Sequence, residues 1–117
     1  MIETIRARLD DLAGPDPDDG ERAVLLRLLR SYAEKTPTAL AELADTVAAG
    51  DPAVVREVAH KLKGSASNVG ASRFADILAD VEVRARDGEL PDADARLRAE
   101  WVGLARDLAT VISELAG

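Results

Sequence analysis

The only histidine of this 117-residue chain, His60, is the side chain best suited to covalent chemistry, because the chain has no cysteine. Apolar residues recur around it every three or four positions, which is typical of an amphipathic helix. On a helical wheel at about 100° per residue, His60 falls about 160° from the centre of the apolar arc. The members of this arc are Val54, Val55, Val58, Leu62 and Ala66. A histidine that filled a gap in the core would lie inside the arc, so we predict that His60 faces solvent.

The neighbours of His60 on the same predicted face favour an anion beside it. Arg56 and Lys63 bring two positive charges to a chain with a formal net charge of −7. Gly64 and Ser67 are small, and a glycine inside an exposed helix costs about 1 kcal/mol relative to alanine. Such a glycine leaves room beside the imidazole, and the cations attract an anion such as a phosphoryl group. The alternative is an ordinary solvated face with an incidental glycine.

The apolar pattern predicts helices throughout and no strand. The expected helices cover about residues 2–13, 21–49, 52–66, 74–85 and 93–116. The second is expected to be one long helix kinked at Pro37, or two helices if Thr36 forms a new N-terminal cap. Asp51 followed by Pro52 is a helix-start signal, so the third helix, which carries His60, has a well-defined beginning.

The predicted fold class is all-α. Four helices with short connections and one apolar stripe each bury those stripes most simply in an antiparallel up-down four-helix bundle. The short leading helix would cap this bundle. The length fits one domain, which we place over residues 1–117, with the leading helix and loop in 1–20 and the bundle in 21–117.

Composition argues against several classes of function. The excess of acidic residues and the small number of aromatic side chains leave no basic stripe or stacking platform for nucleic acid. Without cysteine and with one histidine, the chain lacks the usual zinc and histidine-pair metal sites, so no metal is expected. No apolar run approaches the length of a signal peptide or a membrane span, which favours a cytoplasmic location.

The segment AHKLKGSASNVGA, residues 59–71, resembles the signature of histidine-containing phosphotransfer (HPt) domains. The resemblance is tight over about residues 51–82 and is weakest over the first twenty residues. It implies a helical bundle without kinase activity, whose histidine receives a phosphoryl group from an aspartate of one receiver domain and passes it to another. The implied partners are a hybrid sensor histidine kinase and a response regulator receiver domain. The chain itself would be a monomer without a cofactor, and Mg²⁺ would be bound only in the partner receiver domain.

Carried over residue by residue, the resemblance implies that His60 is phosphorylated on Nε2. Lys63 would lie beside the phosphoryl oxygens, and Gly64 would give the receiver domain room to approach. Glu82, 22 positions after the histidine, would accept a hydrogen bond from the Nδ1–H group of His60. This bond selects the tautomer whose Nε2 lone pair is free to attack.

The resemblance also implies roles for the rest of the motif. The partner domain would contact Arg56, Lys61, Ser67 and Asn68. Ser65 and Ala66 would lie where the third helix packs closely on a neighbour. The Ser65 hydroxyl is not expected to be a nucleophile, because the chain has no second histidine to act as its base.

Three alternatives remain open. The first is the dimerisation and phosphoacceptor domain of a sensor kinase, but such domains usually have an acidic residue after the histidine, where this chain has Lys61. The second is a structural or adaptor bundle whose histidine is never phosphorylated. The third is the N-terminal phosphoacceptor domain of a larger chemotaxis-type kinase. Against the third alternative, the chain begins at Met1 and its last helix finishes at Gly117, as in a free-standing carrier, but a domain trimmed from a larger kinase would look the same.

Overall fold

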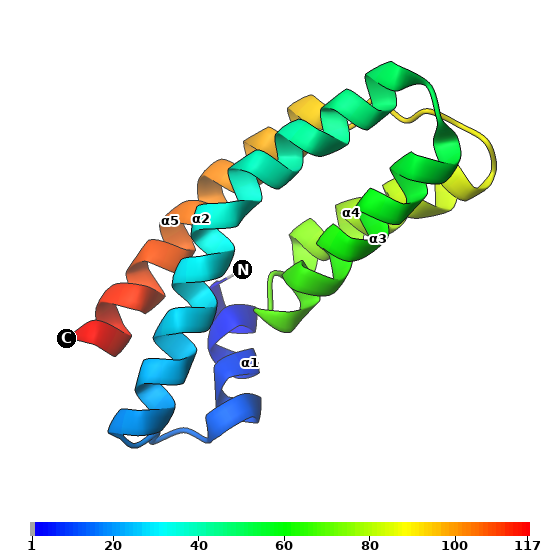
Figure 1. Cartoon of the computed structure of the whole chain (residues 1–117). Helices are drawn as coiled ribbons and strands as arrows, with labels where there is room; N and C mark the ends of the chain where they lie inside the picture. Colours follow the sequence, from blue (N-terminus) through cyan, green and yellow to red (C-terminus); the bar gives the residue numbers. More distant parts are fainter. Residues whose placement is uncertain (1) are drawn as a thin grey trace.

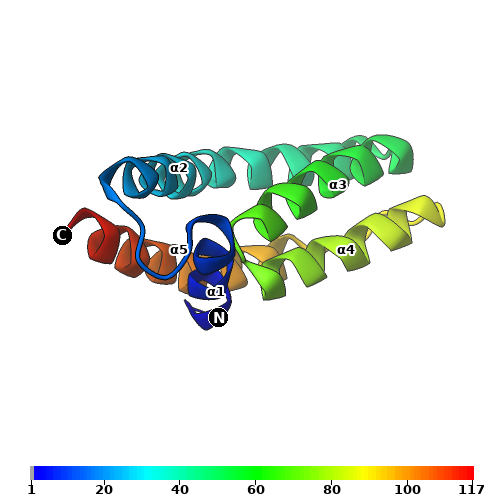
Figure 2. The same cartoon turned by 90° about the horizontal axis from the view of Figure 1, so that it is seen from below.

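The computed structural model describes residues 2–117, and every regular element in that range is a helix. The helices are α1 (Ile2–Ala13), α2 (Asp19–Ala49), α3 (Pro52–Asn68), α4 (Ser72–Arg86) and α5 (Asp94–Ala116). The long helices α2 and α5 run side by side, and the α3–α4 hairpin packs on them, with α3 against α2 and α4 against α5 (Figure 1). The helix α1 lies against α5, next to the turn of that hairpin (Figure 2). The predicted bundle with a short N-terminal helix is therefore confirmed.

The helix that carries His60 begins where the sequence predicts. Gly50 ends α2 in the left-handed conformation, with φ 82°. The side chain of Asp51 then accepts a hydrogen bond from the backbone N–H of Ala53 at 3.1 Å, and Pro52 occupies the first helical position. These caps set the start of α3, and with it the rotational phase in which the helix presents His60.

The long second helix is kinked and not broken. It continues through Pro37, and its axis bends in the cyan part of the ribbon in Figure 1. Proline has no N–H group to donate to the carbonyl of Ala33, which weakens the helix locally. Thr36 does not cap a new helix, because it is buried inside α2 and its Oγ1 donates to the carbonyl of Tyr32 at 2.6 Å.

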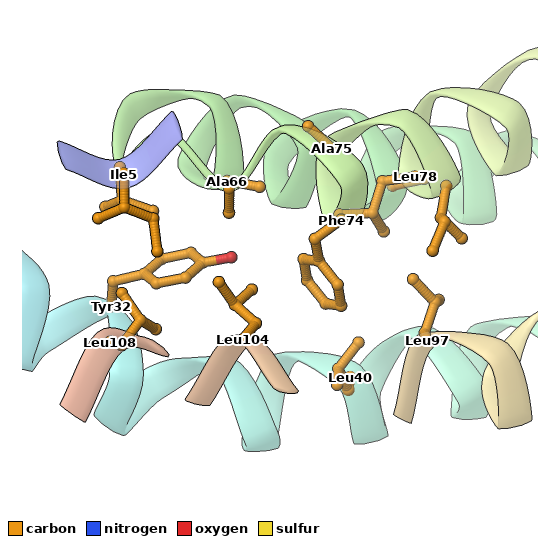
Figure 3. Packing of buried hydrophobic residues seen from close by; sticks show 14 of the residues in the cluster. Ile5, Tyr32, Leu40, Ala66, Phe74, Ala75, Leu78, Leu97, Leu104 and Leu108 are labelled. Atoms are coloured by element: carbon orange, nitrogen blue, oxygen red, sulfur yellow. The ribbon is translucent and has the colours of Figure 1, made fainter. Parts of the chain in front are cut away.

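The core lies between the α3–α4 hairpin and the α2–α5 pair. Phe74 of α4 is fully buried and points between Leu40 of α2 and Leu97 and Leu104 of α5 (Figure 3). Burial of such side chains stabilises each helix pair in proportion to the apolar area removed from water. The hairpin, and with it the face of α3 that bears His60, is thereby fixed on the long helices.

Several positions differ from the predicted apolar stripes. Leu12 continues the apolar spacing of Ile5 and Leu9, and Val54 belongs to the apolar arc of the third helix, but they are 44% and 38% exposed. Ala59 was not assigned to a stripe, but it is fully buried. Because alanine is small, the buried Ala59 leaves room for α3 to pack closely on its neighbours.

Candidate functional site

His60 lies on the exposed face of α3, as predicted. Its side chain is 67% exposed, whereas Ala59 and Val55 on the other side of the helix are fully buried. The ring therefore fills no space in the core. A partner molecule can reach it without any rearrangement of the bundle.

The carboxylate of Glu82 on the neighbouring helix α4 lies against the ring of His60. Glu82 Oε1 lies 2.8 Å from His60 Nδ1, and the Glu82 side chain is only 16% exposed. An ionised carboxylate accepts hydrogen bonds but donates none, so Nδ1 carries the hydrogen and donates it. In the neutral ring, the other nitrogen, Nε2, then holds the free lone pair. The structure brings Glu82 to the ring nitrogen where the resemblance implied it, and its role in transfer stays a prediction.

Lys63 pairs with the second oxygen of the same carboxylate. Its Nζ lies 2.6 Å from Glu82 Oε2. The hydrogen bond from Lys63 holds the pKa of Glu82 below its ordinary value of 4.5, the hydrogen bond from His60 lowers it further, and partial burial opposes both effects. Glu82 therefore stays charged beside the imidazole ring. Sequence reasoning missed this ion pair and placed the ammonium beside the phosphoryl group only.

The surroundings of His60 are open and rich in cations. A Cβ atom added to Gly64 would meet no other atom within 4 Å, so the glycine leaves free space one turn from the histidine. Arg56, Lys61 and Ser67 are exposed, and Arg56 and Lys61 lie around the same depression as His60. A shallow depression around the ring is lined by Ala53, Arg56, Glu57, His60, Lys61 and Glu82.

Two residues of the motif have surroundings that the sequence did not predict. Asn68 contacts α1, because Arg8 donates to its carbonyl oxygen at 3.1 Å and to its Oδ1 at 3.3 Å. Ser65 is exposed on the α2 side of α3, whereas its neighbour Ala66 is fully buried. Close helix packing thus falls on Ala66 and not on Ser65.

The arrangement is suited to carry a phosphoryl group. It combines an exposed nucleophilic nitrogen, a carboxylate that fixes the opposite nitrogen, and cations around the site. Within residues 2–117, no group of three or more histidine and acidic side chains is placed to hold a metal ion. None of the helices described for this chain is long and apolar enough to cross a membrane.

The sequence profile of the Hpt domain matches residues 27–116, which is most of the chain. The chain therefore belongs to the Hpt domain family, the histidine phosphotransfer carriers of phosphorelay signalling. Domains of this family interact with receiver or kinase domains of two-component systems. Comparison with curated proteins and with solved structures gives no significant match.

Proposed function

We propose that His60 is the phosphoryl acceptor of this domain. In this proposal it receives the group from the phosphorylated aspartate of a hybrid kinase receiver domain and passes it to the receiver domain of a response regulator. The observation that carries the proposal is the 2.8 Å hydrogen bond between His60 Nδ1 and Glu82, on a ring that is 67% exposed. The hydrogen bond defines the tautomer of His60, and the exposure of the ring gives access to a large partner domain.

In the transfer step, the Nε2 lone pair of His60 attacks the phosphorus atom of the aspartyl phosphate. An N–P bond forms, the P–O bond to the aspartate breaks, and the carboxylate of the donor leaves with the bonding electron pair. The hydrogen on Nδ1 stays in place, so the ring gains a positive charge as the bond forms. The carboxylate of Glu82 stabilises this charge, and the reverse step uses the same charge to release the phosphoryl group.

Lys63 and Gly64 have supporting roles in the proposal. The ammonium of Lys63 keeps Glu82 ionised, and it is close enough to His60 along the helix to turn toward the phosphoryl oxygens once they are present. The free space above Gly64 admits the loops of the receiver domain. Arg56, Lys61 and Ser67 would contact that domain, whose own Mg²⁺ would neutralise the transferring group.

The test is phosphotransfer from a receiver domain labelled on its aspartate. Wild-type protein and Ser65→Ala should take up label that is lost in acid, because a phosphoramidate hydrolyses in acid and a phosphoserine does not. His60→Gln should take up none and should keep the wild-type melting temperature, since an exposed side chain leaves no cavity. Acid-stable label, or label that persists in His60→Gln, would contradict the proposal and favour a bundle with another role.

A further inference from the structure

A pocket with a volume of about 230 Å³ lies between α2, α4 and α5, at the end of the bundle away from α1 (Figure 1). Its inner wall consists of side chains that are almost fully buried, namely Leu40, Leu43, Val81 and Leu97. All of its α2 residues follow Pro37, where that helix bends. An engineered apolar cavity of about 150 Å³ is large enough to bind benzene. The pocket therefore has room for one aromatic ring with a short side chain.

The mouth of the pocket is negatively charged. Among the lining residues described within 2–117, the titratable ones are two carboxylates, Asp92 and Asp94. Both oxygens of Asp94 accept from Arg98 Nε at 3.0 Å, whereas none of the ion pairs of residues 2–117 involves the exposed Asp92. The last turn of α2 also borders the pocket, and it has no basic residue to offset the negative end of its helix dipole. The positive end of α5 is offset by Asp94 in its first turn, so a cation is favoured at the mouth.

The inner wall of the pocket is connected to the His60 site through α4. Val81 borders the pocket, and the next residue, Glu82, has its Oε1 2.8 Å from His60 Nδ1. Successive side chains of a helix point about 100° apart, so neighbouring residues of α4 face the pocket and the histidine. Protein interiors are close-packed and transmit strain. A molecule that presses on Val81 therefore acts on the turn of α4 that holds Glu82.

We propose that this pocket binds a small molecule with an aromatic body and a cationic amine, and that the bound molecule weakens the contact between Glu82 and His60. The aromatic body lies against Val81 and Leu97, and the ammonium lies at the mouth beside Asp92. The pocket thereby links the concentration of an amine to the state of the exposed histidine. Its lining shares only Asp92, Asp94 and buried apolar residues with the amine and none of the exposed residues around the ring.

Three probes of similar size and different charge test the inference: phenethylamine, phenethyl alcohol and phenylpropionate. In ¹³C methyl spectra of the wild-type protein, the amine should shift the signals of Leu43, Val81 and Leu97 saturably, with a Kd below about 5 mM. The alcohol should bind about fivefold more weakly, since two unit charges about 4 Å apart in water account for about that factor. The acid should bind more weakly still. Absence of saturation with the amine, or equal binding of the three probes, would overturn the inference.

Two pairs of variants separate the pocket from the rest of the surface. Ala44→Leu places a larger side chain in the pocket, whereas Ala41→Leu makes the same change at an exposed position of α2 outside its lining. Ala44→Leu should weaken amine binding at least about tenfold, and Ala41→Leu should stay within about twofold of the wild type. Asp92→Asn should weaken amine binding about fivefold without affecting the alcohol, and the control Asp76→Asn at an exposed position of α4 should affect neither. Because Asp92 is exposed, its variant tests the site even if Ala44→Leu lowers the melting temperature.

Two measurements at His60 test the coupling. Saturating phenethylamine should shift the ¹⁵N signals of the His60 ring in the wild type and in Ala41→Leu but not in Ala44→Leu, at constant pH. Chemical phosphorylation of His60 by phosphoramidate, which needs no docked protein, should slow about two- to fivefold with the same concentration dependence. Binding of the amine without any shift of the ring signals would show that the pocket does not act on His60 and would overturn the coupling.

The outcomes also separate this inference from the phosphotransfer proposal. Amine binding and the ring signals are measured without a phosphoryl donor, so they stand even if no donor labels His60. Conversely, phosphotransfer to His60 by a protein that binds no amine would overturn only the pocket inference. A concentration-dependent dimer that Ala44→Leu abolishes would assign the pocket to a second copy of the chain and would also overturn it.

Discussion

The substitution Glu82→Gln tests how the carboxylate beside His60 assists transfer. It removes one negative charge but keeps an oxygen that can accept the hydrogen bond from Nδ1, now 2.8 Å away. The ring gains a positive charge during the attack on phosphorus. A unit charge pair about 4 Å apart is worth about 1 kcal/mol in water and about 4 kcal/mol at the effective dielectric constant of a protein surface.

The structure places this interaction near the lower end of that range. The ring of His60 is 67% exposed, and the ammonium of Lys63, 2.6 Å from the other oxygen, already offsets part of the negative charge. We therefore expect Glu82→Gln to lose about 1 kcal/mol of transition-state stabilisation, a rate about fivefold lower. Glu82→Ala also removes the hydrogen-bond acceptor, which adds about 1 kcal/mol and makes transfer about thirtyfold slower.

The assay is the initial rate of label transfer from one phosphorylated receiver domain, at fixed pH and low ionic strength. Phosphoramidate labelling of the same variants reports the chemistry without docking. Asp80→Asn is the matched control, because it removes the same charge from a position on α4 whose side chain is 55% exposed. Wild-type rates in Glu82→Gln, or equal slowing in Asp80→Asn, would refute the assignment of this effect to the Glu82 charge.

Three further predictions concern the site and its support. Lys63→Met should raise the pKa of Glu82, because the hydrogen bond from Lys63 is the largest cause of its lowering, and a pH titration of the Glu82 carboxyl ¹³C signal measures this. The pKa of Glu82 is lower in the folded state than in the unfolded state. The ion pair with Lys63 therefore stabilises the fold at pH values above the unfolded pKa, and this stabilisation is lost as the pH falls through the folded pKa. The unfolding free energies of wild type and Lys63→Met should therefore converge in acid. Gly64→Ala should be neutral or stabilise the fold by up to about 1 kcal/mol in denaturant unfolding, whereas Gly64→Gln should slow transfer. Gly88→Ala should lower the free energy of unfolding by about 1–2 kcal/mol, because Gly88 has a positive φ. Gly70→Ala should lower it at least about twice as much in the same measurement, because Gly70 also has a positive φ and its added Cβ would collide with the backbone of α1.

Local signals in the sequence predicted the helices and the exposure of His60. The periodicity of apolar residues reports which side of a helix is buried, and the caps at Asp51 and Pro52 report where α3 begins. Both depend only on residues within a few positions of one another. The same locality explains why the sequence predicts a kink at Pro37 but leaves a full break open, since packing along the rest of α2 decides between the two.

The contacts between helices could be predicted from the sequence only in part. The position of Glu82 beside His60 followed from the family resemblance. The ion pair of Glu82 with Lys63 and the bond from Arg8 to Asn68 had no local signal. Each of them depends on how one helix is rotated and placed against another, which the pattern of a single helix does not contain.

The sequence by itself therefore determined an all-helical chain of the Hpt type with one exposed histidine, because helix phase and capping are short-range properties. Tertiary structure decided which charges meet that histidine, how α1 supports the turn after α3, and that an apolar pocket with an acidic mouth opens between α2, α4 and α5. These features arise from the packing distance and angle between helices. Small residues such as Ala59 and Gly70 set that packing through contacts with residues far away in the chain.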